Sequence, residues 1–316
     1  MLKKLLVVLG ICLFSIFLGC KKDNPTAPEP DFTGCKLTSI SANTGLIKPK
    51  TSVYFYYNNQ LFSQHTIDTS GKTDTSSYFK FKFNGHQLKE KGEVVNGNYI
   101  ILRSFEYDNK SRLSLIKLFD QGNINNFSAF RFYYNDSDRC IYFLVGRVNI
   151  VGNNSTSEPF DSVAFSNFTS HGYPRRITYY HFRQGEFTYL TQRNFEYDPY
   201  GNIIKHSAGA DTNEYLMYEY EYDLRTPYNL EWTDLNKVIL LSEYENHIIN
   251  PTGLLPDIAV DKYPKTKITH YDYQRVPQRS FIKSVFDSEN RCIEELITPE
   301  LAHKASVLNT YTYTCK

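Results

Sequence analysis

Cysteine is the residue type whose spacing in this chain suggests chemistry, as a disulfide partner, a metal ligand or a nucleophile. Six cysteines occur, at positions 12, 20, 35, 140, 292 and 315. The last four include no C-x-x-C pair and have no histidine at ligand spacing, which is typical of disulfides rather than of zinc. Of three connectivities we favour Cys35 with Cys315, because they flank the folded region, and Cys140 with Cys292. Cys140 and Cys292 occupy the same position in two copies of a repeated motif. The alternative is that all four cysteines are buried free thiols.

Other residues give weak signals for catalysis or metal binding. The sequence contains no G-x-S-x-G, H-E-x-x-H or G-x-x-x-x-G-K-[ST] motif, and its eight histidines are dispersed. Asn135-Asp-Ser-Asp138 has oxygen ligands suited to calcium, yet these residues are also expected in a turn. Glu294 and Glu295 must point to opposite faces of a strand, so they do not converge as an acid pair. We therefore predict no metal, no cofactor and no catalytic residue.

The repeated motif indicates the elements that position these residues. Three segments align without gaps: Phe105-Glu-Tyr-Asp-Asn-Lys-Ser-Arg-Leu113, Phe132-Tyr-Tyr-Asn-Asp-Ser-Asp-Arg-Cys140 and Phe195-Glu-Tyr-Asp-Pro-Tyr-Gly-Asn-Ile203. Looser copies start at positions 81, 165, 220 and 285. The spacing of the copies is enough for two strands and two turns in each.

Each copy contains a turn signal. In Asp198-Pro-Tyr-Gly201, Asp bonds the turn backbone, Pro presets φ and Gly accepts a positive φ, which predicts a type I turn leading into a bulge. The turn residues that we expect in the copies are Asp108, Asn135, Asp198, Gly201, Asp223 and Asp287.

The residues before the turns alternate between aromatic and charged. Phe79-Lys-Phe-Lys-Phe83 and Tyr218-Glu-Tyr-Glu-Tyr222 are examples. This period of two predicts antiparallel strands with one aromatic face and one solvent-exposed, charged face. We expect a mainly β fold, an antiparallel meander of repeated hairpins forming a large twisted or curved sheet. One or two short helices are expected, at 233–244 behind a Thr cap and at 298–305 with a Pro in the first turn.

The N-terminus has the order of a secretory signal. A basic start, Lys3-Lys4, precedes the apolar run from Leu5 to Leu18. A helix of this run would span roughly 21 Å, less than the ~30 Å of a bilayer core, so removal as a signal is favoured over a transmembrane helix. We divide the chain into a signal, 1–19, a Pro-rich tether, 20–31, and one all-β domain, 32–316.

The Gly19-Cys20 pair that ends this run resembles the lipobox of bacterial lipoproteins, although Phe17 and Leu18 stand where those boxes usually have Leu and a small residue. The resemblance implies cleavage before Cys20 and acylation of its thiol. It also implies attachment to a membrane, and Lys21 in place of an inner-membrane retention Asp points to the outer membrane. The leaflet stays open.

The F-x-Y-D-x-x-G-[RN]-[LI] pattern resembles the tyrosine-aspartate (YD) repeat of RHS-type bacterial surface and toxin-shell proteins. Together with the lipobox, it is similar to lipoproteins of unknown function in Bacteroidota-type outer membranes. The resemblance covers roughly residues 79 to 292 and implies stacked β-hairpins. Five or six copies are too few to enclose a toxin, so that activity is not implied.

Composition bounds the function. The chain has 26 Tyr and 22 Phe, and its 35 Lys and Arg nearly balance its 34 Asp and Glu. This excludes a disordered chain, a strongly basic nucleic-acid binder and a polytopic helical membrane protein. Two function classes stay open: a non-catalytic binding or scaffold lipoprotein for a protein or glycan, and a glycan-binding or glycan-processing protein whose site is assembled from distant residues. The absence of catalytic motifs favours the first.

Overall fold

The computed structural model describes residues 35–42, 50–57, 60–67, 72–225, 227, 263–301 and 306–315, except positions 86, 121, 153, 171, 210–212, 273 and 290. Every regular element in this part of the chain is a β-strand. The strands are β1 (Cys35–Ala42), β2 (Lys50–Tyr57), β3 (Gln60–Ile67), β4 (Ser77–Asn84), β5 (Gln87–Val95), β6 (Asn98–Tyr107), β7 (Leu113–Asp120), β8 (Asn123–Tyr134), β9 (Cys140–Val151), β10 (Asn154–Phe168), β11 (Pro174–Arg183), β12 (Glu186–Tyr197), β13 (Ile203–Ala208), β14 (Tyr215–Tyr222), β15 (Lys265–Tyr271), β16 (Pro277–Phe286), β17 (Cys292–Pro299) and β18 (Ser306–Cys315).

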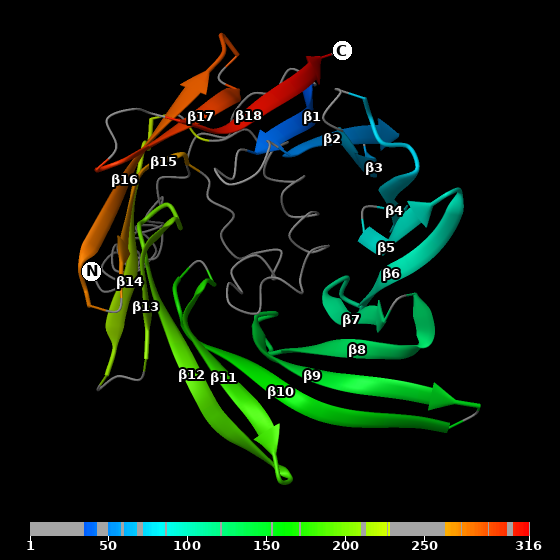
Figure 1. The fold of residues 1–316 in the computed structure, drawn as a ribbon. Coiled ribbons are helices and arrows are strands. Elements are labelled where there is room, and N and C mark those ends of the chain that lie inside the picture. Colours follow the sequence, from blue (N-terminus) through cyan, green and yellow to red (C-terminus); the bar gives the residue numbers. More distant parts are fainter. Residues whose placement is uncertain are drawn as a thin grey trace, which may run out of the picture.

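These strands form one antiparallel sheet that closes on itself. Each strand pairs with the next along the chain, and β18 also pairs with β1. Figure 1 shows the resulting ring of strands, in which the blue β1 lies beside the red β18. The predicted antiparallel meander of hairpins is confirmed. The expected large twisted or curved sheet is corrected in one respect, because the sheet closes into a barrel. The first and last strands satisfy each other's backbone groups, which removes both sheet edges.

The predicted helices are not confirmed. The segment 233–244 lies outside the described residues. In the segment 298–305, Thr298 and Pro299 end β17, positions 300 and 301 form a turn, and positions 302–305 lie outside the described residues. Pro299 therefore ends a strand and does not start a helix. At the end of a strand, its missing N–H does not interrupt the backbone hydrogen bonds of the sheet.

The two faces of the barrel differ, as the alternation predicts. On one face, the phenylalanines that begin the motif copies are buried, with at most 6% of the side chain exposed; they are Phe81, Phe105, Phe132, Phe165 and Phe195. The other face carries the cross-strand ion pairs Lys82–Glu90, Lys117–Glu106, Lys205–Glu196 and Lys267–Glu221. Because the large buried cluster lies on the aromatic face, this face lines the concave inside of the barrel, and the ion-paired face is the outside. A smaller buried cluster, Phe127, Ala129 and Val148, lies on the outer face of β8 and β9.

The repeat turns have the predicted geometry. The backbone N–H of Asp198 donates to the carbonyl of Asn202, and that of Gly201 donates to the carbonyl of Asp198 (3.0 and 3.1 Å). The Asp198 carboxylate accepts from the N–H groups of Tyr200 and Asn202. Gly201 has φ +90°, and a Cβ there would lie 2.5 Å from the Tyr173 ring. The same backbone pattern recurs at the turns that begin at Asp108, Asn135 and Thr169.

The motif copies all lie at one end of the barrel, here called the repeat rim. Their starts fall on the even-numbered strands β4 to β16, so the turns that follow share one end of the ring. A similar turn from Asp272 to Val276, which was not predicted, lies at the opposite rim, because it follows the odd-numbered β15. Both Cys35, which begins β1, and Cys315, which ends β18, lie at the repeat rim.

The motif tyrosine connects neighbouring hairpins at this rim. Its hydroxyl donates to a carbonyl on the preceding strand, in the bonds Tyr107 to Leu88 (3.0 Å), Tyr134 to Leu113 (2.7 Å), Tyr197 to Pro174 (2.8 Å) and Tyr222 to Ile203 (2.8 Å). Tyr313 of β18, outside the motif copies, makes the same kind of bond to Cys292 (3.0 Å). For Tyr134 the last backbone pair between the two strands is Arg131 with Leu115. The hydroxyl therefore bonds a carbonyl that lies beyond the end of the backbone ladder.

We expect Tyr134→Phe to lower the free energy of unfolding by about 1–2 kcal/mol, because the Leu113 carbonyl loses its donor while the ring is retained. Denaturant unfolding measures the change. Tyr133→Phe is the matched control, since that ring stacks on Tyr142 of the next strand and does not bridge to Leu113. Equal stability of wild type and Tyr134→Phe would contradict the role of the hydroxyl.

Candidate functional site

The predicted cysteine sites divide into three groups. Cys20 lies outside the described residues, so its lipidation stays a prediction. Cys35 and Cys315 face each other as the first register pair of β1 with β18. This backbone position is compatible with the predicted disulfide between them, which also stays a prediction.

The expected Cys140–Cys292 disulfide is wrong, because both thiols are free and buried. Burial raises the pKa of each thiol to about 12, which keeps both protonated and unreactive at neutral pH. Cys140 begins β9 and Cys292 begins β17, and these strands are not neighbours in the sheet. Two residues at the same position of different motif copies therefore lie at different points around the ring of strands.

The predicted turn residues bond to the backbone and to neighbouring side chains of the repeat rim. Asn135 uses its side-chain oxygen to accept the N–H groups of Ser137 and Arg139. Lys110 and then Arg112 bind Asp138 and lower the pKa of its carboxyl. Among the described residues, no group of three His, Cys, Asp or Glu side chains is placed to hold a metal ion.

A pocket on the inner wall of β6 to β9 is the candidate binding site. Its cavity volume is about 470 Å³, and its lining residues are Leu102, Arg103, Leu118, Phe119, Asp120, Asn126, Phe127, Ser128 and Arg147. Four of these residues lie directly opposite one another across the strands: Arg103 with Leu118, Leu118 with Ser128, and Ser128 with Arg147. Arg103 shares its face with the buried Phe105, two residues on, so this row points into the barrel.

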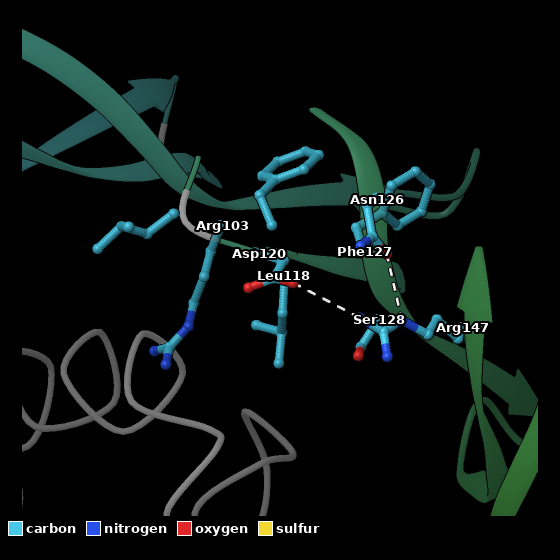
Figure 2. A pocket seen from close by; sticks show the side chains of 9 residues that line it. Arg103, Leu118, Asp120, Asn126, Phe127, Ser128 and Arg147 are labelled. Carbon is cyan, nitrogen blue, oxygen red and sulfur yellow. Dashed lines mark hydrogen bonds and ion pairs between the residues drawn. The ribbon is translucent and has the colours of Figure 1, made fainter. Parts of the chain in front are cut away.

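The polar groups of the pocket are partly pre-arranged (Figure 2). Arg147 donates from Nε to the Asn126 side-chain oxygen (3.2 Å) and from Nη2 to Asp120 (3.5 Å). Leu118, 6% exposed, forms an apolar patch between the two arginines. The pocket therefore combines two guanidinium groups, one carboxylate and an apolar wall.

Sequence reasoning missed the pocket. Arg103 and Arg147 belong to different motif copies and form no short motif with each other. One signal was available. Arg103 lies two residues from Phe105 and Arg147 lies two residues from Val145, so each arginine occupies an inward position at which an aromatic or aliphatic residue is expected. Nothing in the pattern showed that the two positions belong to one pocket.

A stack of rings crosses the inner wall on the other side of the barrel. His206 stacks on Phe195 (4.8 Å between centroids) and on Tyr218 (5.8 Å), and Tyr218 stacks on His270 (4.9 Å). Burial, and then the positive charge of Arg193, lower the pKa of His206 to about 4. His206 is therefore a neutral packing residue at pH 7 and not a base poised for catalysis.

No protein-family model and no curated protein matches the chain. Among solved structures, it is similar to a porin-like protein from Bacteroides uniformis, at 11% identity and a TM-score of 0.45, over 92% of this chain and 99% of that one. A porin-like protein from Bacteroides vulgatus matches at 10% identity and a TM-score of 0.43, over 88% and 98%. The complex TcdB2-TccC3-Cdc42 matches at 11% identity and a TM-score of 0.31, over 84% of this chain but 14% of that one.

Within the part of the chain that the structure describes, no helix is long and apolar enough to cross a membrane.

Proposed function

We propose that this protein is a lipid-anchored, non-catalytic binding protein of the outer membrane, and that its ligand binds in the inner-wall pocket. The inner-wall pocket is the observation that supports this proposal. Its volume of about 470 Å³ lies in the range of small-molecule sites, and it joins an apolar wall to a few convergent polar groups. The partner is a small molecule or the end of a glycan or protein chain.

A glycan-processing function is supported less well, because the described pocket residues do not include a pair of carboxyl groups. Glycoside hydrolysis generally uses two carboxyl groups on either side of the bond that breaks. Of the described pocket residues, Asp120 alone is a carboxylate, and it is in an ion pair with Arg147. Binding is therefore supported better than hydrolysis.

The chain ends favour one orientation at the membrane. Fourteen residues separate Cys20 from Cys35, which begins β1 at the repeat rim. A lipid on Cys20 would hold this rim towards the bilayer and leave the other rim facing away. Membrane-spanning barrels carry a continuous apolar band on the outside. This outer face carries ion pairs between four pairs of strands and a single small apolar cluster on β7 to β9 among the described residues, so we propose that the barrel does not span the bilayer and lies next to its surface.

Anchoring is tested by metabolic labelling with an alkyne fatty acid in cells that express the full chain. We expect the label on wild type, its loss in Cys20→Ser and release of that variant from the membrane fraction, because Cys20 is the acylation site. Cys140→Ser is the control and should keep the label, since that thiol is buried in the barrel. A wild-type protein without label would contradict the anchor.

Binding is tested by native mass spectrometry of the full protein extracted from membranes, together with thermal unfolding in envelope extracts. We expect either a co-purified small molecule that leaves on unfolding, or a raised Tm in the extract, because a ligand that binds only the folded state stabilises it. A protein with neither a bound mass nor a Tm shift would contradict the binding function.

A further inference from the structure

We infer that the inner-wall pocket binds a small organic ligand through an oxyanion, either a phosphate or a carboxylate. The inference rests on the proposed binding function and names the ligand class of the same site. Its basis is the arrangement of charged side chains along one row of the inner wall.

The row is longer than the pocket itself. Arg103 lies opposite Lys91 of β5 on one side, and Arg147 lies opposite Glu158 of β10 on the other. Neighbouring strands are about 4.8 Å apart, so the backbone positions of Arg103 and Arg147 are separated by three spacings, about 14 Å. A small ligand that lies over Leu118 and Ser128, between the two positions, is within reach of both long side chains.

The charge of the row is positive on the side of Lys91. Lys91 is 4% exposed and lies over the Phe79 ring, with 4.4 Å from Nζ to the ring centroid. Lys91 and Arg103 lie directly opposite each other, so two positively charged side chains are present at this end of the row. Two carboxylates lie near Arg147 at the other end: Asp120 of the pocket and Glu158, the last member of the row.

Arg147 has donors left for a ligand. A guanidinium has five N–H donors, and Asn126 and Asp120 each engage one nitrogen of Arg147. The contact with Asp120 is long, at 3.5 Å, and both groups are about half exposed. The planar fork of arginine matches the two oxygens of a carboxylate or phosphate, which favours an oxyanion over a neutral ligand.

Isothermal titration of the full protein in detergent tests the inference with three probes that share one sugar ring: glucose 6-phosphate, glucuronate and glucose. We expect at least one anionic probe to bind and glucose not to bind. Binding of the phosphate or of the carboxylate probe decides which oxyanion is preferred. Arg103→Gln and Arg147→Gln should each weaken binding about tenfold or more, since each removes a charged hydrogen bond.

Arg225→Gln is the matched control, because Arg225 pairs with Asp223 in a repeat-rim turn away from the pocket, and it should leave affinity unchanged. Equal binding of glucose, unchanged affinity in both pocket variants, or no binding of any probe to the folded protein would overturn the oxyanion site. If the probes fail while the native mass measurement still shows a bound molecule, the binding function stands and the ligand class is wrong. A large fall in Tm for Arg103→Gln with unchanged affinity would show a structural residue instead.

Discussion

Replacing Cys35 by serine should lower the free energy of unfolding of the oxidised protein by up to about 5 kcal/mol, if Cys35 and Cys315 form the predicted disulfide. The bond would close a loop that contains the whole barrel and would therefore remove much of the conformational freedom of the unfolded chain. Its position gives it a second effect. β1 and β18 form the one strand pair that joins the two ends of the sheet, and the two cysteines begin that pair.

Denaturant unfolding with and without reductant measures this effect in wild type, Cys35→Ser, Cys315→Ser and the double variant. The three variants should be equally destabilised, and reductant should reduce wild type to their level. Cys140→Ser is the control, whose response to reductant should match wild type, because the Cys140 thiol is free. Thiol counting in the denatured protein gives a direct check: reactive Cys35 and Cys315 without reductant would contradict the bond.

Acid should destabilise the barrel through His206, by about 3 kcal/mol between pH 7 and pH 4. The pKa of His206 in the folded protein is lowered to about 4, whereas an unfolded histidine has a pKa near 6.5. As the pH falls through 6.5 the unfolded chain takes up a proton that the folded barrel does not. The contribution of neutral His206 to stability is therefore fully present above pH 6.5. It decreases as the pH falls from 6.5 towards 4, where the folded protein also binds the proton.

Free energies of unfolding at pH 7.5, 5.5 and 4 measure the loss. His206→Phe keeps a ring between Phe195 and Tyr218 and should remove most of the pH dependence over this range. Tyr218→Phe changes the same stack without removing the titrating group, so it should retain the loss. The same slope in wild type and His206→Phe would show that other groups cause the acid sensitivity.

Local structure was predictable where neighbouring residues decide it. The turn at Asp198 and Gly201 follows from side-chain bonds to the adjacent backbone and from the positive φ that glycine accepts, and the structure confirms both. The aromatic and charged faces follow from the period of two along a strand. The repeat starting at Phe165, the weakest in sequence, also leads into a turn of this type, with Thr169 in place of aspartate.

Residue pairing around the ring was not predictable in the same way. Cys140 and Cys292 share a motif position, and the sequence offered no measure of how many strands separate them. Arg103 and Arg147 have no motif in common, and their approach depends on the register of three successive strand pairs. A register shift of one residue in any of them would turn one side chain to the outside.

By itself, the sequence determined the hairpins, their turns, the two faces of the sheet and the expected signal and lipid site at Cys20. These features depend on contacts between near neighbours along the chain, so a repeated motif specifies them repeatedly. Only the tertiary structure decided that the sheet closes and that Arg103 and Arg147 line a common pocket on its inner wall. Closure depends on the twist and stagger of eighteen strands added together, until β1 meets β18, and no single segment of sequence encodes that sum.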